Sequence, residues 1–205
     1  MTTKRTMLSA LVGCTIMVGP ALAQEKKPAA PPAMSAEEKA MMEAFDKMAA
    51  VGSNHKLLEY MLGDWTTNNK MWMQPGAPPI ESLGSCSSKS SMGGRYILSE
   101  HKGMAMGKPF EGVATSGYDN LTGKFVATWM DNMSTGIMSL TGSYDAAGKS
   151  FTFWSEMPDP MQPKVVIKVR EVVKLVDKDK HIMEWYETRD GKEAKTMELT
   201  YTRKK

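Results

Sequence analysis

The feature that most constrains the fold is a series of tight-turn signals between short strand-like segments. Residues 118–125 (YDNLTGKF) and 144–151 (YDAAGKSF) are near-repeats in which an aspartate is followed by a Gly-Lys pair, and residues 189–192 (RDGK) are a third example. Asp and Gly at these spacings are typical of β-hairpin turns. Strands that follow one another through tight turns must run antiparallel.

After residue 63 no stretch shows helical periodicity, and strand-like segments alternate with turn signals. Hairpin-linked strands in a domain of this size form either a sandwich or a closed up-and-down barrel. A barrel leaves no exposed strand edge, and no long crossover interrupts the series. We therefore expect a mainly β fold, a single antiparallel up-and-down barrel of about ten strands. The expected strands are 65–74, 80–90, 95–103, 110–117, 124–131, 136–144, 150–156, 164–176, 181–188 and 194–203.

The register of the last hairpin depends on the length of its turn. A three-residue Arg-Asp-Gly loop with a glycine bulge gathers the apolar side chains on one face, whereas a two-residue Asp-Gly loop does not. We predict the first arrangement. The shared face would carry Met183, Trp185, Met197, Leu199 and Tyr201. In strand 164–176 the same alternation places Glu171 among apolar residues, where a carboxylate is costly unless it is paired, hydrogen-bonded or near an opening.

Residues 1–23 have the pattern of a secretory signal peptide. Lys4 and Arg5 precede an apolar run that ends in Ala-Leu-Ala, which predicts cleavage after Ala23 and a periplasmic or secreted protein. The run is too short for a spanning helix, which needs about 20 apolar residues. An alternative is lipid attachment at Cys14, although the residues after Cys14 stay apolar.

Residues 24–34 are rich in Pro and Ala and are interpreted as a disordered tether. Ser35 and Glu38 form a capping-box pattern that starts a helix. An apolar stripe on this helix is expected to pack against the domain: Met41, Phe45 and Met48. A second, short helix is expected to start with Ser53 as its cap. Residues 35–205 then form one domain, a helical lead-in followed by the barrel.

Charge and cysteine content exclude several classes of function. The formal net charge is +3, and removal of Lys4 and Arg5 leaves +1, with no long basic block. Neither nucleic acid nor an anionic membrane is therefore predicted as a partner. Cys86 is the only cysteine after position 23, so no internal disulfide forms, and a buried thiol of this kind usually serves as a small apolar filler. The oligomeric state and any role of Cys86 stay open.

The segment YMLGDW (60–65) lies where the short helix gives way to the first strand. Gly63 and Trp65 resemble the G-x-W signature of lipocalins and related barrels. The resemblance implies that the helix closes one end of the barrel, that the glycine allows a tight entry, and that the tryptophan fills the floor. It also implies that a basic residue from the last strand packs on the indole, a position that Arg203 matches.

A longer resemblance extends from His55 to Arg203. Its motifs include HKLLEYMLGDW, GGRYILSEHKG, GYDNLTGKFVATWMDNMSTG and MELTYTR. Together they are similar to a bacterial secreted family of unknown function with a lipocalin-like (calycin-type) β-barrel. Membership implies a barrel and brings no assigned activity, cofactor or catalytic residue.

Metal and cofactor chemistry has little support in the sequence. The three histidines, His55, His101 and His181, form no zinc-binding pattern, and we predict no cofactor. A barrel of this type can hold haem through one histidine, and His181 or His101 would be the candidate. Methionine pairs such as Met104/Met106 suggest Cu(I) binding as another alternative, although methionine more often fills irregular cores.

The segment TWMDNMSTG (128–136) concentrates an aromatic ring and polar groups at a strand end, which is typical either of a ligand site or of a turn. We predict a binding protein without catalysis whose barrel holds a small, largely apolar molecule. The predicted lining residues are Met71, Trp129, Asp131, Glu171 and Trp185. A barrel enzyme that uses Asp131 or Glu171 as a general base is a further alternative.

Overall fold

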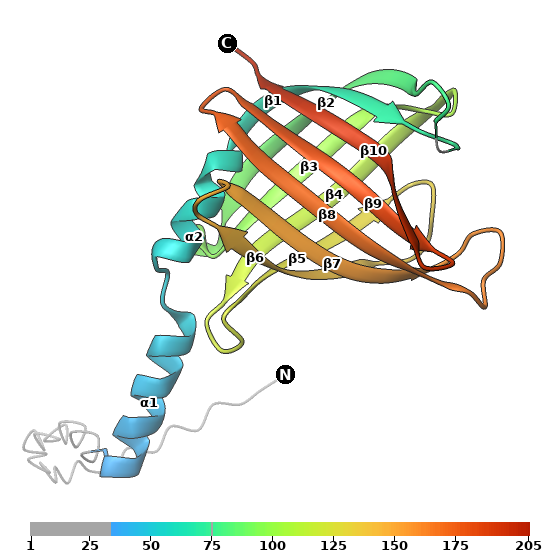
Figure 1. The fold of residues 1–205 in the computed structure, drawn as a ribbon. Helices are drawn as coiled ribbons and strands as arrows, with labels where there is room; N and C mark the ends of the chain where they lie inside the picture. The colour runs from blue at the N-terminus through green and yellow to red at the C-terminus, as the bar shows by residue number, and fades with distance from the viewer. Residues whose placement is uncertain (1–33, 75) are drawn as a thin grey trace, which may run out of the picture.

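The structure is a computed structural model that describes residues 34–74 and 76–205. The predicted signal peptide and most of the predicted tether lie outside the described residues. Ten antiparallel strands follow one another around a closed barrel, in which β1 pairs with both β2 and β10 (Figure 1). The predicted fold class is therefore confirmed. The strands are β1 (Gly63–Met71), β2 (Ile80–Ser91), β3 (Tyr96–Ala105), β4 (Lys108–Asp119), β5 (Lys124–Asp131), β6 (Met138–Asp145), β7 (Ser150–Pro158), β8 (Val166–Asp177), β9 (Lys180–Arg189) and β10 (Lys192–Arg203).

Buried side chains of β3 and of β5 to β8 meet in an apolar core at one end of the barrel. The short helix α2 (Ser53–Leu58) and the following 3₁₀ turn (Glu59–Met61) cover this end, and Leu58 is buried there. The core consists of Leu58, Ile97, Phe125, Leu140, Phe151, Phe153 and Val173. Gly52, and not Ser53, is the N-cap of α2, and the imidazole of His55 accepts the Gly52 N–H at 3.1 Å.

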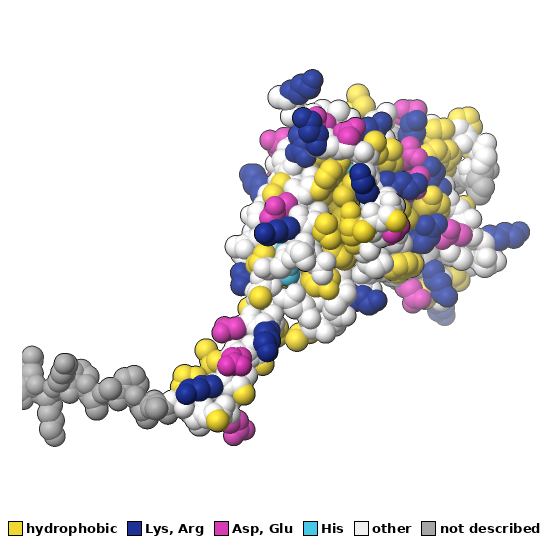
Figure 2. Space-filling model, turned by 60° about the vertical axis from the view of Figure 1, so that its left-hand side comes forward, with side chains coloured by type: hydrophobic (Ala, Val, Ile, Leu, Met, Phe, Trp, Pro, Cys, Tyr) yellow, Lys and Arg dark blue, Asp and Glu magenta, His cyan; other side chains and the backbone are white. Residues whose placement is uncertain are grey.

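The helix α1 (Ala36–Ala49) begins with the predicted capping box, in which Ser35 and Glu38 exchange hydrogen bonds of 3.1 and 2.7 Å. The expected packing of its apolar stripe is wrong, because no residue of α1 is buried. The helix extends away from the barrel and carries its apolar side chains on the surface (Figures 1 and 2). Its C-terminal end is held by the side-chain amide of Asn120, which donates to the carbonyls of Lys47, Met48 and Ala50. Among the described residues, no helix has the length and hydrophobicity needed to cross a membrane.

The apolar face predicted for the last hairpin is correct, but the position of the bulge that produces it differs from the prediction. Met197 pairs with Trp185, so these side chains share a face. The turn is a two-residue Asp190-Gly191 loop with positive φ at both positions, and the register shift lies between Lys195 and Met197. A bulge at Thr196 thus replaces the predicted bulge at the turn.

The two near-repeat turns carry different residues at one position with positive φ, and this difference should affect the free energy of unfolding. The residue four positions after the aspartate of each turn has positive φ. This residue is Gly123 in one turn and Lys149 in the other. A left-handed conformation costs a non-glycine residue roughly 1 kcal/mol. We expect Lys149→Gly to raise the free energy of unfolding in urea by about 0.5 to 1 kcal/mol, and Gly123→Ala to lower it by about 1 kcal/mol. A loss of stability in Lys149→Gly would contradict this interpretation of the turn.

Candidate functional site

The floor of the barrel is sealed by an indole and a guanidinium group. Trp65 has no exposed surface, and its Nε1–H donates to the carbonyl of Met61 at 3.0 Å. The guanidinium carbon of Arg203 lies 4.0 Å from the centroid of the Trp65 rings. Arg203 also donates to the carbonyls of Leu62, at 2.6 Å, and Tyr60, at 3.3 Å. The last strand is thus fastened to the helical cover.

Gly63 makes room for this arrangement. Its φ of +111° is one that side-chain-bearing residues rarely adopt, and a Cβ atom there would lie 2.5 Å from Nη1 of Arg203. The three residues that the resemblance implied for closure, Gly63, Trp65 and Arg203, are therefore in mutual contact.

Above the floor lies a layer of polar side chains that point inward. The thiol of Cys86 is 3.4 Å from Oγ of Ser88 and 3.5 Å from Nε2 of His101, and the hydroxyls of Ser88 and Ser99 are 2.7 Å apart. Burial raises the pKa of the Cys86 thiol and lowers the pKa of His101 to about 4. Both groups are therefore neutral at pH 7, and the pair is not an activated thiolate and imidazolium.

His181 and Tyr201 complete this layer. Their rings are stacked with centroids 4.2 Å apart, and the edge of His181 meets the Trp65 rings at 4.5 Å. Burial, with smaller contributions from Arg203 and His101, lowers the pKa of His181 to about 3. Its Nδ1 atom is buried and has no hydrogen-bond partner among the described residues. Burial also raises the pKa of Tyr201, and the charges of Cys86 and Glu171 raise it further.

The side chains proposed for metal or haem chemistry are placed by the same contacts. His101 faces the Cys86 thiol, and His181 is packed between Tyr201 and Trp65. Within residues 34–74 and 76–205, no group of three His, Cys, Asp or Glu side chains is positioned to hold a metal ion. The Met104 and Met106 side chains are exposed at the β3–β4 turn.

Glu171 lies deeper in the barrel than any other predicted lining carboxylate. It is paired across the sheet with Phe153 on β7 and Trp185 on β9. Burial raises the pKa of its carboxyl group to about 7. No hydrogen bond or ion pair joins it to another residue in the described part of the chain, yet the side chain is only half-buried. The surface that it keeps therefore faces the interior of the barrel.

The Trp129 indole is fixed by Asp131. Nε1–H of Trp129 donates to Oδ2 of Asp131 at 2.7 Å, and Oδ1 of the same carboxylate accepts the backbone N–H groups of Met133 and Ser134. Trp129 also stacks on Phe110 at 6.2 Å. Asp131 thus accepts the turn hydrogen bonds that one of the two alternatives implied, and it also orients the Trp129 ring.

At the end opposite the floor the inward-facing residues differ in exposure, and Ile167 and Val169 on β8 are fully buried there. Trp65, Phe151 and Phe153 are fully buried, whereas Met71 and Trp129 are half-buried. Trp185 and Met197 are half-buried as well, and Met71 pairs with Met197, which pairs with Trp185. The barrel is therefore filled at the α2 end and along β8, while inward side chains of β1, β5, β9 and β10 keep some accessible surface at the other end. The register brings all five predicted lining residues onto the inward face.

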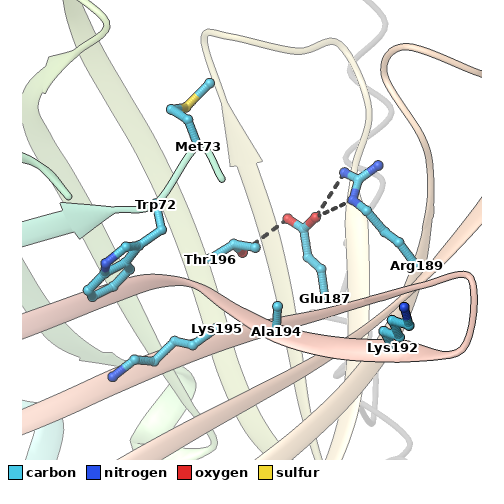
Figure 3. Close-up of a pocket in the computed structure, with 8 residues that line it drawn as sticks. All are labelled: Trp72, Met73, Glu187, Arg189, Lys192, Ala194, Lys195 and Thr196. Atoms are coloured by element: carbon cyan, nitrogen blue, oxygen red, sulfur yellow. Dashed lines mark hydrogen bonds and ion pairs between the residues drawn. The ribbon is translucent and has the colours of Figure 1, made fainter. Parts of the chain in front are cut away.

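A hollow of about 230 Å³ opens at the rim of this end (Figure 3). It is lined by Trp72, Met73, Glu187, Arg189, Lys192, Ala194, Lys195 and Thr196. Glu187 accepts hydrogen bonds from Arg189 and from the bulged Thr196, as Figure 3 shows. It lies two residues beyond Trp185 on the same face of β9, and Trp185 is the cross-strand neighbour of Glu171.

Sequence reasoning missed the contact between Cys86 and His101 and the whole rim. The pairing of neighbouring strands could have indicated the Cys86 contact. Cys86 on β2 is the cross-strand neighbour of Trp65 on β1 and of His101 on β3. The rim had none, since it depends on the unpredicted bulge at Thr196.

Comparison with known structures supports the fold. One similar chain is that of the crystal structure of Rv2717c from M. tuberculosis, which is 13% identical, with a TM-score of 0.55 over 76% of this chain and 100% of that chain. Another is EF1p2_mFAP2b bound to DFHBI, at 10% identity and a TM-score of 0.39, over 74% of this chain and 100% of that chain. The second value is too low to carry an argument. A search of curated proteins gives no match.

The family comparison covers nearly the whole barrel. Residues 50–203 match the family described as "Protein of unknown function (DUF1579)". This range begins just before α2 and ends at Arg203, so it contains the floor, the polar layer and the rim. The chain therefore belongs to the DUF1579 family of proteins of unknown function.

Proposed function

We propose that the protein binds a small, largely apolar molecule inside its barrel, beside Glu171. The observation that carries the proposal is Glu171, whose carboxyl group is surrounded by protein but keeps surface that no described residue covers. A concave, mostly apolar space with a few polar groups is the usual form of a small-molecule site. The resemblance of the Gly63–Trp65 floor to that of lipocalins supports the same function.

In this proposal each predicted lining residue has a distinct role. The indoles of Trp129 and Trp185 and the thioether of Met71 provide apolar contact surface. Glu171 provides the one charged group, and Asp131 acts by holding the Trp129 indole in place. We also propose that the protein is exported to the periplasm or secreted, which the signal-peptide pattern in residues 1–23 supports.

A dye titration tests the binding proposal. N-phenyl-1-naphthylamine, a neutral apolar fluorophore, should gain fluorescence on binding to the wild-type protein. Trp185→Ala should weaken this binding at least about tenfold, because a large part of the contact surface is lost. Trp154→Ala is the matched control, since Trp154 lies on the outer face of β7 and is 49% exposed. Equal effects of the two substitutions, or no dye binding to the wild type, would contradict the proposal.

A catalytic role for Glu171 is a second candidate, favoured by one observation. A general base works best when its pKa lies near the operating pH, and the pKa of Glu171 is about 7. Both oxygens of Asp131, by contrast, are occupied as hydrogen-bond acceptors. The expected signature is a pH-dependent turnover that Glu171→Gln abolishes and Asp131→Asn does not.

A further inference from the structure

The polar groups on the interior surface around Glu171 are hydrogen-bond acceptors that lack donors. A carboxylate accepts hydrogen bonds, and the described residues supply it with no donor and no cation. A second acceptor faces the same interior. Oδ1 of Asn69 is buried and has no hydrogen-bond partner within residues 34–74 and 76–205. Asn69 pairs with Leu199, which pairs with Met183 on the inward face of the last hairpin.

Aromatic rings flank the Glu171 carboxylate. Phe153 is its cross-strand neighbour on one side and Trp185 on the other. Directly opposed residues of neighbouring strands have Cβ atoms roughly 5 Å apart, so both rings lie beside the carboxylate. Tyr201 on β10 is the titratable group whose pKa is raised by the charge of Glu171. His101 on β3 and Cys86 on β2 lie near Tyr201. None of these groups is a cation at pH 7.

An unpaired inward carboxylate with an aromatic neighbour on each side is complementary to a cationic ligand. The faces of aromatic rings attract cations, most strongly in the case of tryptophan, and a set of such faces is the common way in which proteins hold quaternary ammonium groups. A neutral ligand would leave the carboxylate desolvated and unpaired, which costs free energy. A cation with an apolar body removes this cost and keeps the contacts with the indoles.

We propose that the ligand of this barrel is an organic ammonium ion, with its charged nitrogen between Glu171 and Trp185 and its apolar part towards the rim. This inference rests on the proposed function and narrows it from apolar molecules in general to apolar cations. The rim residue Glu187 lies on the same face of β9 as Trp185, two residues nearer the rim.

Two molecules of the same shape test the inference. Phenyltrimethylammonium and tert-butylbenzene differ in charge and hardly in size, and calorimetry measures the binding of each to the full chain. The wild type should bind the ammonium ion at least about tenfold more tightly than the hydrocarbon, because a buried ion pair with an aromatic contact contributes 1.4 kcal/mol or more. Equal affinity, tighter binding of the hydrocarbon, or no binding of the ammonium ion would overturn the inference.

Two substitutions locate the effect. Glu171→Gln should remove most of the preference for the ammonium ion and leave the affinity for tert-butylbenzene unchanged, whereas Glu156→Gln, an exposed carboxylate on the outer face of β7, should change neither. Trp185→Leu keeps an apolar side chain without a π face and should reduce the preference about threefold or more. A preference that survives in Glu171→Gln would place the cation elsewhere.

The pH dependence gives an independent readout. Phenyltrimethylammonium carries its charge at every pH, so any change in its affinity comes from the protein. With the pKa of Glu171 near 7, its affinity should rise about tenfold from pH 6 to pH 8, and this rise should vanish in Glu171→Gln. An affinity that falls over this range would show that the protonated carboxyl group binds the ligand and would overturn the inference. Failure of the dye N-phenyl-1-naphthylamine to bind, with phenyltrimethylammonium still bound, would contradict the general apolar proposal alone.

Discussion

Replacing Trp65 with alanine is expected to lower the free energy of unfolding by about 3 to 5 kcal/mol, the range typical of fully buried tryptophans. The indole has no exposed surface and contacts Arg203 on one face and His181 at its edge. Its loss leaves a cavity beside a guanidinium group that then lacks an aromatic partner. Few single substitutions in this chain should cost as much.

Urea unfolding followed by circular dichroism measures this effect. Trp154→Ala removes the same number of atoms from the outer face of the barrel, where the side chain is about half exposed, and should cost below about 1 kcal/mol. Comparable costs for the two substitutions would contradict the role of Trp65 as the sealed floor. A double-mutant cycle with Arg203→Met should then give a coupling of about 0.5 to 2 kcal/mol for the cation on the indole.

Glu171→Gln is expected to stabilise the empty protein at pH 8 by up to about 3 kcal/mol and to give no such gain at pH 4.5. Burial raises the pKa of Glu171 in the folded state to about 7, from an ordinary value of 4.5. The folded state therefore holds a proton that the unfolded state releases between these values, and stability falls as the pH rises through them. Each unit of difference corresponds to about 1.4 kcal/mol.

Two histidines act in the opposite direction over part of this range. The pKa values of His101 and His181 are lowered from 6.5 to about 4 and about 3, so the unfolded state binds their protons first and stability falls as the pH drops below 6.5. Below pH 7 the two histidines together outweigh Glu171, so the wild type should lose stability towards acid and change little between pH 7 and pH 8. In Glu171→Gln the loss towards acid should be steeper, because the opposing contribution of Glu171 is gone.

Urea unfolding at a series of pH values separates the two contributions. The difference in unfolding free energy between Glu171→Gln and wild type should grow steadily from pH 4.5 to pH 8. Glu156→Gln, at an exposed position, should show no such trend. A constant difference across the range would mean that the Glu171 carboxyl group is hydrated like a surface residue, and the interior site would lose its main support.

The strands and turns were predictable because their signals are local. Asp119 and Asp145 accept hydrogen bonds from backbone N–H groups two or three residues later, which is the reason that aspartate begins such turns. Alternation then placed Glu171 on the inward face. The bulge at Thr196 could not be predicted. A bulge at the turn and a bulge within the strand both place the apolar residues of the last hairpin on one face, so the hydrophobic pattern does not distinguish them.

Contacts across the barrel were beyond sequence reasoning. The His101 and Tyr201 rings lie on β3 and β10, and they face each other at 6.0 Å only because the sheet closes with a particular stagger. The exposure of α1 was also unpredictable. Periodicity shows that the helix has an apolar stripe, but whether a surface is available to cover that stripe is a property of the whole fold.

The placement of an organic ligand beside Glu171 and Trp185 is tested most directly by fluorine NMR of protein labelled with 5-fluorotryptophan. The five tryptophans lie at the floor (Trp65), the rim (Trp72), the outer face (Trp154) and the proposed site (Trp129 and Trp185). Titration with phenyltrimethylammonium should shift the resonances of Trp185 and Trp129 and leave those of Trp65 and Trp154 in place. Shifts confined to Trp154 or Trp72, or no shift at saturating concentration, would contradict the proposed site.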